Sequence, residues 1–440
     1  ANMGVHFPHS MLALRFLGGA GEVGRSCIEV SCQGRAILLD CGINLAARGD
    51  RFPLRASCPV DAVILSHAHL DHAGMVPWAT REYECKVIAT PPTVDLSELL
   101  LTDALRLSGS LGYELPYTNE DIMRVRSSEV EALYHEEIEL GPFKVTLYCS
   151  GHVLGASMVY LEARGVRVLY TSDFSARSTR LLPPAETDLP EADILVVEST
   201  YGGDSDSHPA LKKTERTLID AIKDALEREG RVLIPSFALG RAQEVLSIIA
   251  DYMRSGYLPE YPVFVDGMIR EVNRIYFLYW EWLKPEVRRK VRQTRASPLE
   301  HPMMSDVADR SEILEISEPY IVVTTSGMLE GGPVLEYLRE IAPDSRSLIV
   351  LTGYQVESTR GRALLSGVRE LELPDGPVEV RARVHFAELS AHADQKQILQ
   401  FTSKLRGVRR AFVVHGELEK SMQLARKLEK LRGYTVHIPR

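Results

Sequence analysis

The chain has 440 residues, of which 45% are hydrophobic and 25% charged, a composition that excludes a largely disordered protein and predicts two or three globular domains. The net charge of −9 excludes a surface that is basic throughout, although it allows a basic groove on an acidic body. No apolar run approaches the ~20 residues that a membrane helix needs. The N-terminus lacks the pattern of a signal peptide, and the six cysteines form no CxxC pair, so we expect reduced thiols and a cytoplasmic protein.

The first 200 residues are rich in predicted strands. Short apolar runs, mostly bounded by Gly or Pro, predict strands at 12–19, 26–32, 35–42 and 61–68, and a helical pattern covers 93–139. Further predicted strands lie at 85–92, 143–151, 157–163, 167–173 and 192–200. Several of these runs end in polar residues, which places polar groups at one edge of a sheet, where functional sites are usually built.

After residue 203 the pattern changes to an alternation of helices and strands. The amphipathic segment 210–230 predicts a helix, 231–240 a strand and 241–256 a second helix. More strands are expected at 263–267, 320–327 and 347–353. Such an alternation is typical of a parallel α/β unit. From residue 377 strand-like runs return, and a helix over 418–433 follows them.

The strongest chemical signal is HAHLDH at 67–72, directly after the predicted strand DAVILS. Imidazole and carboxylate groups suit zinc or another first-row metal. In an extended segment, residues two apart point the same way, so His67 and His69 can bind one ion, while a turn directs Asp71 and His72 towards a second. Four ligands in six residues are too many for one tetrahedral site that keeps a position for water, so we predict two metal ions.

HAHLDH resembles the HxHxDH signature of the metallo-β-lactamase superfamily. The resemblance implies that Asp40, at the end of a predicted strand, supports the metal ligands from behind, and that His152 and Asp173 are ligands, with Asp173 between two ions. In small hydrolases of this superfamily the last His follows within several tens of residues, but 173–200 contains none. The next candidate is His415 in VVHGE, after an interval long enough for a whole domain.

This interval resembles the β-CASP nucleases, in which a second domain is inserted into the metallo-β-lactamase fold. Their three additional motifs match Glu198 in VVEST, His392 in LSAHADQ and His415. The resemblance extends over about 12–440 and implies a four-layer αββα metallo-β-lactamase domain with an inserted α/β, parallel-sheet β-CASP domain. The expected boundaries are 1–203 for the N-terminal part of the first domain, 204–376 for the β-CASP domain and 377–440 for the C-terminal part.

The resemblance suggests an assignment of ligands and catalytic roles. One ion receives His67, His69, His152 and Asp173, and the other receives Asp71, His72, Asp173 and His415. We expect zinc, with manganese as the alternative, because nitrogen and carboxylate donors dominate. A hydroxide oriented by Asp71 would attack phosphorus, and His392, held by Glu198, would protonate the leaving O3′. The expected products carry a 5′-phosphate and a 3′-hydroxyl.

Three stretches, SFALGRAQEVL, TTSGMLEGGP and TGYQVESTRGR, resemble archaeal and bacterial homologues of the cleavage and polyadenylation specificity factor nuclease. Within the β-CASP nucleases, a His at the position of His415 is typical of the branches that act on RNA, so single-stranded RNA is the expected substrate. Candidate phosphate contacts follow strands of the inserted domain, with ordinary capping of strand and helix ends as the alternative: Ser326, Gly327, Ser358 and Arg360. The basic segment 284–295 and the metal ions predict a locally basic cleft and salt-sensitive binding. A homodimer is expected by analogy with relatives.

The alternatives are a DNA nuclease of the same family, a small-ester or thioester metallo-hydrolase and a metal-free RNA-binding subunit. His415 disfavours the first, the long interval before His415 disfavours the second and the filled ligand positions disfavour the third. Endonuclease and 5′-to-3′ exonuclease activity both remain open, because they share the same chemistry.

Overall fold

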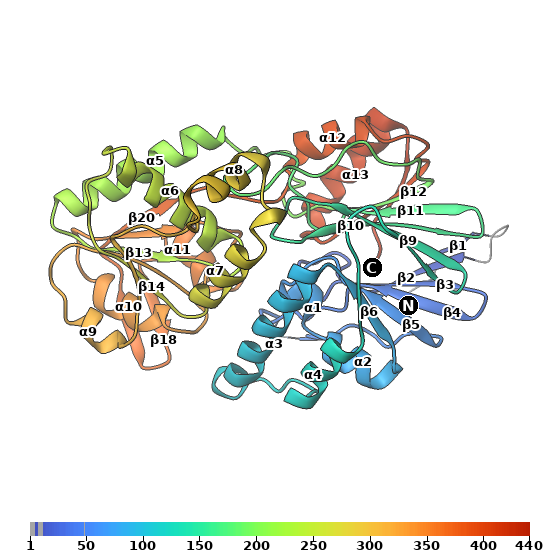
Figure 1. Cartoon of the computed structure of the whole chain (residues 1–440), viewed down its shortest axis with the longest axis horizontal. Coiled ribbons are helices and arrows are strands. Elements are labelled where there is room, and N and C mark those ends of the chain that lie inside the picture. The colour runs from blue at the N-terminus through green and yellow to red at the C-terminus, as the bar shows by residue number, and fades with distance from the viewer. Residues whose placement is uncertain (1–4, 8–11, 48) are drawn as a thin grey trace. The chain divides into compact units, whose positions relative to one another are not determined.

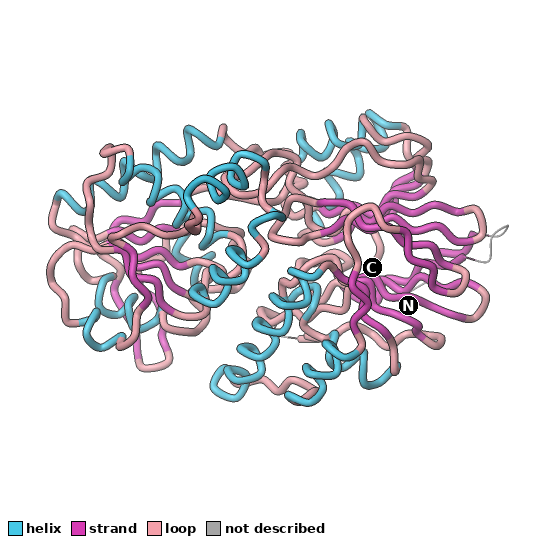
Figure 2. Tube along the Cα trace, viewed as in Figure 1, coloured by secondary structure: helices cyan, strands magenta, loops and turns pink. Residues whose placement is uncertain are grey.

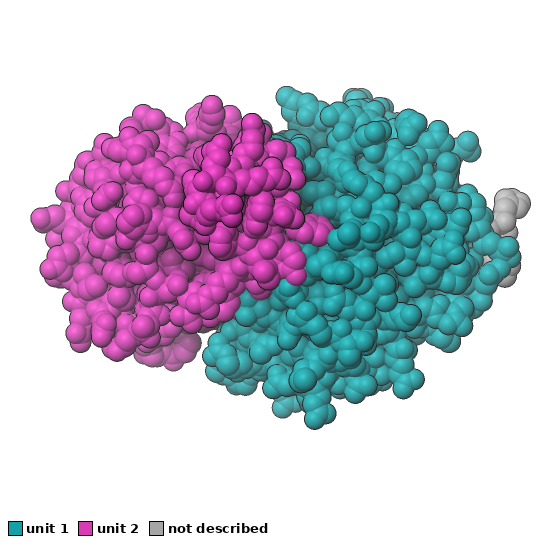
Figure 3. All heavy atoms as spheres, viewed as in Figure 1, with its two compact units in different colours: residues 1–178, 182–207, 391–440 teal, residues 179–181, 208–390 magenta. Residues whose placement is uncertain are grey.

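The computed structural model describes residues 5–7, 12–47 and 49–440, and its contacts divide the chain into two compact units (Figure 3). Unit 1 comprises Ala1–Ser178, Leu182–Ser207 and Ala391–Arg440, and unit 2 comprises Thr179–Leu181 and His208–Ser390. The prediction that the N-terminus is not a signal peptide concerns residues of which 1–4 and 8–11 lie outside the described part of the chain. No helix within the described ranges is both long and apolar enough to cross a membrane.

Unit 1 contains two seven-stranded sheets over the described residues. The first has the order β1 (Val5–Phe7), β2 (Leu12–Gly18), β3 (Cys27–Cys32), β4 (Arg35–Leu39), β5 (Val60–Ile64), β6 (Lys86–Ala89) and β7 (Glu129–Glu131). The second has the order β22 (Thr435–His437), β21 (Arg410–Val414), β12 (Ile194–Glu198), β11 (Val166–Tyr170), β10 (Ser157–Ala163), β9 (Phe143–Cys149) and β8 (Glu137–Leu140). Because β11, β12, β21 and β22 pair in parallel, their carboxyl ends meet at one edge of the sheet.

The two sheets of unit 1 pack face to face between layers of helices (Figure 1). Their shared core includes Leu14, Ile37, Val159, Val196 and Phe412, all fully buried. The outer face of the first sheet packs against α2 (Val76–Tyr83), α3 (Pro91–Leu111) and α4 (Asn119–Ser127), and the outer face of the second against α12 (Gln395–Ser403) and α13 (Leu418–Arg432). This arrangement confirms the predicted four-layer αββα domain.

Local sequence signals define several helix ends in unit 1. Thr118 and Asp121 form a capping box at the start of α4, in which each side chain binds the other residue's backbone N–H. Asp394 and Gln397 do the same for α12. Helix α13 stops at Gly433, which adopts the left-handed conformation that glycine accepts without strain.

Unit 2 is built on a six-stranded sheet whose pairings are all parallel, as the alternation of helices and strands predicted. The order is β15 (Met304–Asp306), β14 (Val263–Asp266), β16 (Ile321–Thr324), β13 (Val232–Pro235), β17 (Leu348–Leu351) and β20 (Arg383–Phe386). Helices cover both sides of this sheet (Figure 2): α5 (Leu211–Glu227), α6 (Arg241–Arg254), α7 (Ile269–Leu278), α8 (Pro285–Thr294), α9 (Arg310–Leu314), α10 (Val334–Ile341) and α11 (Arg360–Leu365). A 3₁₀ turn, η1 (Trp280–Trp282), and a hairpin of β18 (Glu370–Leu373) and β19 (Gly376–Glu379) complete it.

The expected domain boundaries at 203 and 376 stay predictions. By contacts, residues 377–390 belong to unit 2, because β20 pairs with β17 along its whole length. The short segment 179–181 also belongs to unit 2. There the guanidinium of Arg180 forms ion pairs with Glu215 and Asp251.

Candidate metal centre

The HAHLDH segment follows β5 and turns into the short helix α1 (Leu70–Ala73). His67 lies fully buried in the loop, His69 precedes α1, and Asp71 and His72 lie in its single turn. The chain beside α1 approaches so closely that a Cβ on Gly42 would lie 1.7 Å from the carbonyl oxygen of Asp71, so only glycine fits there. This contact holds the turn that redirects Asp71 and His72.

The other candidate residues come from the polar ends of the second sheet. Asp173 follows β11, Glu198 ends β12 and His415 follows β21, so three neighbouring parallel strands deliver side chains to the same edge. His152 lies in the loop after β9, and His392 precedes α12. Residues up to 344 positions apart in the sequence therefore meet at one place, as the contact of His415 with Asp71 shows.

These side chains form two groups whose ligand atoms lie within 4.8 Å of one another: His67, His69 and His152, and Asp71, His72, Asp173 and His415. A third group, His152, Asp173 and His392, meets the same limit and overlaps both. Asp173 belongs to the second group and also faces the first. Its Oδ2 lies 3.1 Å from Nε2 of His72, 3.5 Å from Nε2 of His67 and 3.6 Å from Nε2 of His152. A carboxylate in this position can contact two cations at once.

The donor atoms fit a divalent metal ion. Nε2 of His67, Nε2 of His72 and Oδ1 of Asp173 are buried without a hydrogen bond, a state that costs about 1–3 kcal/mol per group unless another partner binds it. Burial and neighbouring imidazoles lower the pKa of His67 well below its usual value, which favours the neutral ring that a metal requires. Burial opposes ionisation of Asp173, but His415 and His72 outweigh it and hold the pKa of this carboxyl well below its ordinary value.

Hydrogen bonds behind the ligands orient their rings. Nδ1 of His152 donates to the carbonyl oxygen of Ala391 at 2.8 Å, and Nδ1 of His72 donates to Oδ2 of Asp40 at 2.6 Å. Both bonds place a proton on Nδ1 and direct Nε2 towards the cluster, the orientation that a metal ligand needs. Burial opposes protonation of His72, but the carboxylates of Asp173, Asp71 and Asp40 outweigh it and raise the pKa of His72 well above its usual value, so a metal ion that binds this Nε2 would displace a proton. Asp40 is fully buried, and its role behind the candidate ligands stays a prediction.

The sequence did not reveal three polar residues around this centre. Ser66 donates to Asp40 through its backbone N–H at 2.8 Å and its hydroxyl at 2.9 Å, and the hydroxyl of Tyr170 donates to the same carboxylate at 2.8 Å. The hydroxyl of Thr200 lies 2.9 Å from Nδ1 of His415. One signal in the sequence could have identified these three residues, because each of them lies within three positions of a candidate residue.

Glu198 and His392 form a pair beside the two groups. Nδ1 of His392 lies 2.9 and 3.1 Å from the two carboxylate oxygens of Glu198, which also accepts a hydrogen bond from the backbone N–H of Phe174 at 2.7 Å. Burial alone lowers the pKa of His392, but the carboxylate of Glu198 outweighs it and raises this pKa above its usual value. The pair therefore favours a protonated imidazole.

The four candidate phosphate contacts lie in unit 2, where two of them bind other residues of the same unit. The hydroxyl of Ser326 accepts hydrogen bonds from the backbone N–H groups of Glu330 and Gly331. The guanidinium of Arg360 pairs with Glu330 at 3.1 Å and donates to two backbone carbonyls. The other two candidate residues are distinguished by their backbone geometry. Ser358 has a φ of 73°, and a Cβ on Gly327 would come within 2.9 Å of the backbone nitrogen of Phe237. Their role towards phosphate stays a prediction.

Comparison with known families matches nearly the whole chain. The model of the metallo-β-lactamase superfamily matches residues 20–228, the β-CASP domain 242–364, and the Zn-dependent metallo-hydrolase RNA specificity domain 377–439. Fold and site thus define a metallo-hydrolase of the metallo-β-lactamase superfamily. The chain belongs to the β-CASP family within it, as predicted.

Two groups of archaeal relatives resemble the chain along most of its length. The "RNase J-like protein" of Methanocaldococcus jannaschii is 38% identical over 431 residues, which cover 98% of each chain. The "Transcription termination factor FttA" of Thermococcus kodakarensis is 36% identical over 451 residues, covering 96% of this chain and 69% of that protein. A crystal structure of a protein of unknown function from Enterococcus faecalis V583 shares the fold, with a TM-score of 0.57, 13% identity and 98% coverage of both chains.

Proposed function

We propose that this chain is a metal-dependent ribonuclease that hydrolyses single-stranded RNA to products with 5′-phosphate and 3′-hydroxyl ends. The observation that carries the proposal is the position of Asp173, which belongs to one group of candidate ligands and lies within 3.6 Å of His67 and His152 in the other, with the Glu198–His392 pair beside them. The names of the relatives, an RNase J-like protein and a transcription termination factor, support a role in RNA processing or termination.

The ligands in this proposal are His67, His69, His152, Asp71, His72, Asp173 and His415, with Asp40 behind them. Two divalent ions, zinc with manganese as the alternative, would lower the pKa of water and neutralise charge on the phosphate. The side chain of Asp71 is 28% exposed, more than the other carboxylates of the centre, so it is accessible to orient an attacking water. His392, protonated through its contact with Glu198, would hold the proton that the leaving O3′ requires.

The test uses 5′-labelled single-stranded RNA and the metal-loaded chain. We expect cleavage, and we expect His392→Ala to reduce turnover roughly 100- to 10,000-fold because the general acid is lost. His135→Ala is the matched control, since His135 is exposed and hydrogen-bonds Glu186 away from the candidate ligands. Turnover of a thioester or of DNA in place of RNA, or full RNA turnover by His392→Ala with normal metal content, would contradict the proposal.

Circular RNA separates the two modes of cleavage that the proposal includes. A closed circle has no end, so its cleavage demonstrates endonuclease activity, whereas an exonuclease leaves it intact. Linear RNA with a 5′-monophosphate or a 5′-triphosphate then tests preference for the end. The homodimer and the cytoplasmic location stay predictions.

A further inference from the structure

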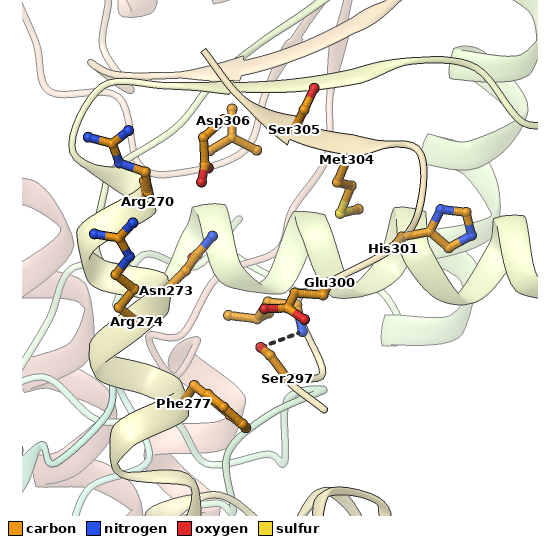
Figure 4. Close-up of a pocket in the computed structure, with 12 residues that line it drawn as sticks. Arg270, Asn273, Arg274, Phe277, Ser297, Glu300, His301, Met304, Ser305 and Asp306 are labelled. Carbon is orange, nitrogen blue, oxygen red and sulfur yellow. Dashed lines mark hydrogen bonds between the residues drawn. The ribbon is translucent and has the colours of Figure 1, made fainter. Parts of the chain in front are cut away.

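Unit 2 contains a cavity of about 290 Å³ that none of the candidate metal ligands lines. Figure 4 shows it between α7 on one side and β15 with the loop 297–303 on the other. Arg270, Arg274 and Phe277 come from α7, and Met304 and Asp306 come from β15. The volume lies close to the lower limit of ligand pockets, which is about 300 Å³.

The side of the cavity formed by α7 carries two guanidinium groups. Arg270 and Arg274 are four residues apart, so they lie one turn apart on the same face of the helix, as Figure 4 shows. Arg270 pairs with Glu271 at 3.1 Å, and within the described residues Arg274 forms no salt bridge. Two planar guanidinium groups at this spacing can bind the oxygens of one phosphate group.

Apolar side chains extend the same surface. Phe277 lies three residues after Arg274 and is 38% exposed, so part of its ring is open to solvent. Val265 and Leu299 are buried in the wall of the cavity, and Met304 is half-buried. An exposed ring above an apolar wall is a surface on which a nucleobase can stack.

The opposite side of the cavity offers hydrogen-bond acceptors and donors. Asp306 and Ser305 lie on β15, and Figure 4 shows them across the cavity from Asn273 on α7. Burial raises the pKa of Asp306, although Arg270 and Arg274 favour its ionised form. Figure 4 shows Asp306 beside Arg270, whereas Glu300, which also lines the cavity, is drawn between Asp306 and Phe277. A carboxylate accepts hydrogen bonds from the amino groups of bases, so Glu300 suits the polar edge of a base that stacks on Phe277, while the arginines suit an anion.

We propose that this cavity binds a nucleotide, with its phosphate on Arg270 and Arg274 and its base against Phe277. The ligand is a nucleoside monophosphate, either free or within an RNA strand. The site goes beyond the proposed function, because binding here requires neither metal nor hydrolysis.

The test measures binding by the full chain after treatment with a chelator, so that hydrolysis does not interfere. AMP, GMP, CMP and UMP are titrated by calorimetry, and at least one is expected to bind saturably. Arg274→Ala and Phe277→Ala are each expected to weaken binding about tenfold or more. Arg381→Ala and Leu278→Ala, which change exposed residues outside the cavity lining, are the matched controls and are expected to stay within twofold of the unmodified chain.

Three further measurements complete the design. Arg274→Lys keeps the charge but loses the planar fork, so it is expected to bind more weakly than the unmodified chain and more tightly than Arg274→Ala. The matching nucleoside is expected to bind at least tenfold more weakly than the monophosphate. Thermal melting checks that each variant is folded, which we expect because Arg274 and Phe277 are exposed.

Competition by a short single-stranded RNA identifies the source of the nucleotide. Displacement of the monophosphate by RNA assigns the site to an RNA strand, and the absence of displacement assigns it to a free nucleotide. No saturable binding, equal affinity for inorganic phosphate, or equal affinity of Arg274→Ala and Arg381→Ala would overturn the proposal. If the chain cleaves RNA but binds no nucleotide after chelation, the nucleotide site is refuted and the proposed ribonuclease activity is not. If the chain binds a nucleotide but the metal-loaded chain does not cleave RNA, the ribonuclease activity is refuted and the nucleotide site is not.

Discussion

At the scale of single residues, Asp40 is the residue on which the orientation of the candidate centre most depends. It accepts hydrogen bonds from His72, Tyr170 and both donors of Ser66, and it is completely buried. Its φ of 63° is rare for a residue with a side chain and is maintained by these contacts. Asp40 therefore fixes the position of His72 without belonging to either group of candidate ligand atoms.

We expect Asp40→Asn to weaken metal binding about 10- to 100-fold, because the amide no longer provides a charged acceptor for Nδ1 of His72. Competition with a chromogenic chelator measures this affinity independently of catalysis. Asp61→Asn is the control, since Asp61 pairs with the exposed Arg35. Equal metal affinity of the two variants would show that Asp40 does not orient the ligand.

At the scale of elements, Asp121 links the start of α4 to α2. Burial opposes its ionisation, but the N–H of Thr118 and the guanidinium of Arg81, which lies at 2.8 Å, outweigh burial and lower its pKa. A carboxyl group with a lowered pKa stabilises the fold above its unfolded pKa of about 3.9, and this contribution is lost as the pH falls through the lower folded value.

Asp121→Ala is therefore expected to reduce the free energy of unfolding by about 1–2 kcal/mol at pH 7, through loss of the cap and the ion pair. The difference from the unmodified chain is expected to shrink as the pH falls below about 3.9 and through the lowered pKa of Asp121, because the folded protein then loses this charge. Urea unfolding at several pH values measures it, and Glu120→Ala, an exposed change in the same helical turn, is the control. If the difference in the free energy of unfolding did not depend on pH, the loss of stability would come from packing and not from the charge of Asp121.

A second element-scale feature is Arg180, which ties the segment 179–181 to α5 and α6 of unit 2. Arg180→Ala leaves Glu215, which is 6% exposed, without its guanidinium partner, and is expected to cost about 2 kcal/mol after allowance for the partial exposure of Arg180. Urea unfolding followed by tryptophan fluorescence of unit 2 measures this loss. Arg381→Ala breaks only an exposed ion pair and is expected to change stability little, so equal effects would contradict the role of Arg180.

Particular elements also show how much of the fold and of the candidate site could be predicted from the sequence. HAHLDH is a local motif, so the position of His67, His69, Asp71 and His72 follows from one strand and one turn. The meeting of Asp173 and His415 depends on β12 and β21 becoming neighbours across a long interval, which only the family resemblance indicated. A short apolar run does not specify which sheet it joins, which is why the strand at 383–386 was expected with the first domain.

At the scale of the whole molecule, the chain combines a unit that holds the candidate metal ligands with a unit that holds none of them. The candidate ligands all belong to unit 1, whereas unit 2 has its own parallel sheet and its own apolar cluster around Tyr320, Tyr337 and Leu351. Metal binding stabilises only the folded form of the unit that holds the ligands. Removal of metal should therefore affect the two units differently.

The three tryptophans allow this difference to be measured, because Trp78 belongs to unit 1 while Trp280 and Trp282 belong to unit 2. In a Trp280→Phe and Trp282→Phe double variant, fluorescence reports unit 1, and a chelator is expected to lower its stability by about 2.7 kcal/mol or more relative to metal at 100 times its Kd. In Trp78→Phe, fluorescence reports unit 2, whose transition is expected to stay unchanged. Asp173→Asn in the first background is expected to reduce the response to metal, because it removes the charge that faces both groups of ligands. Equal shifts of both transitions on chelation would mean that the units unfold as one, and no shift of either would mean that metal does not stabilise unit 1.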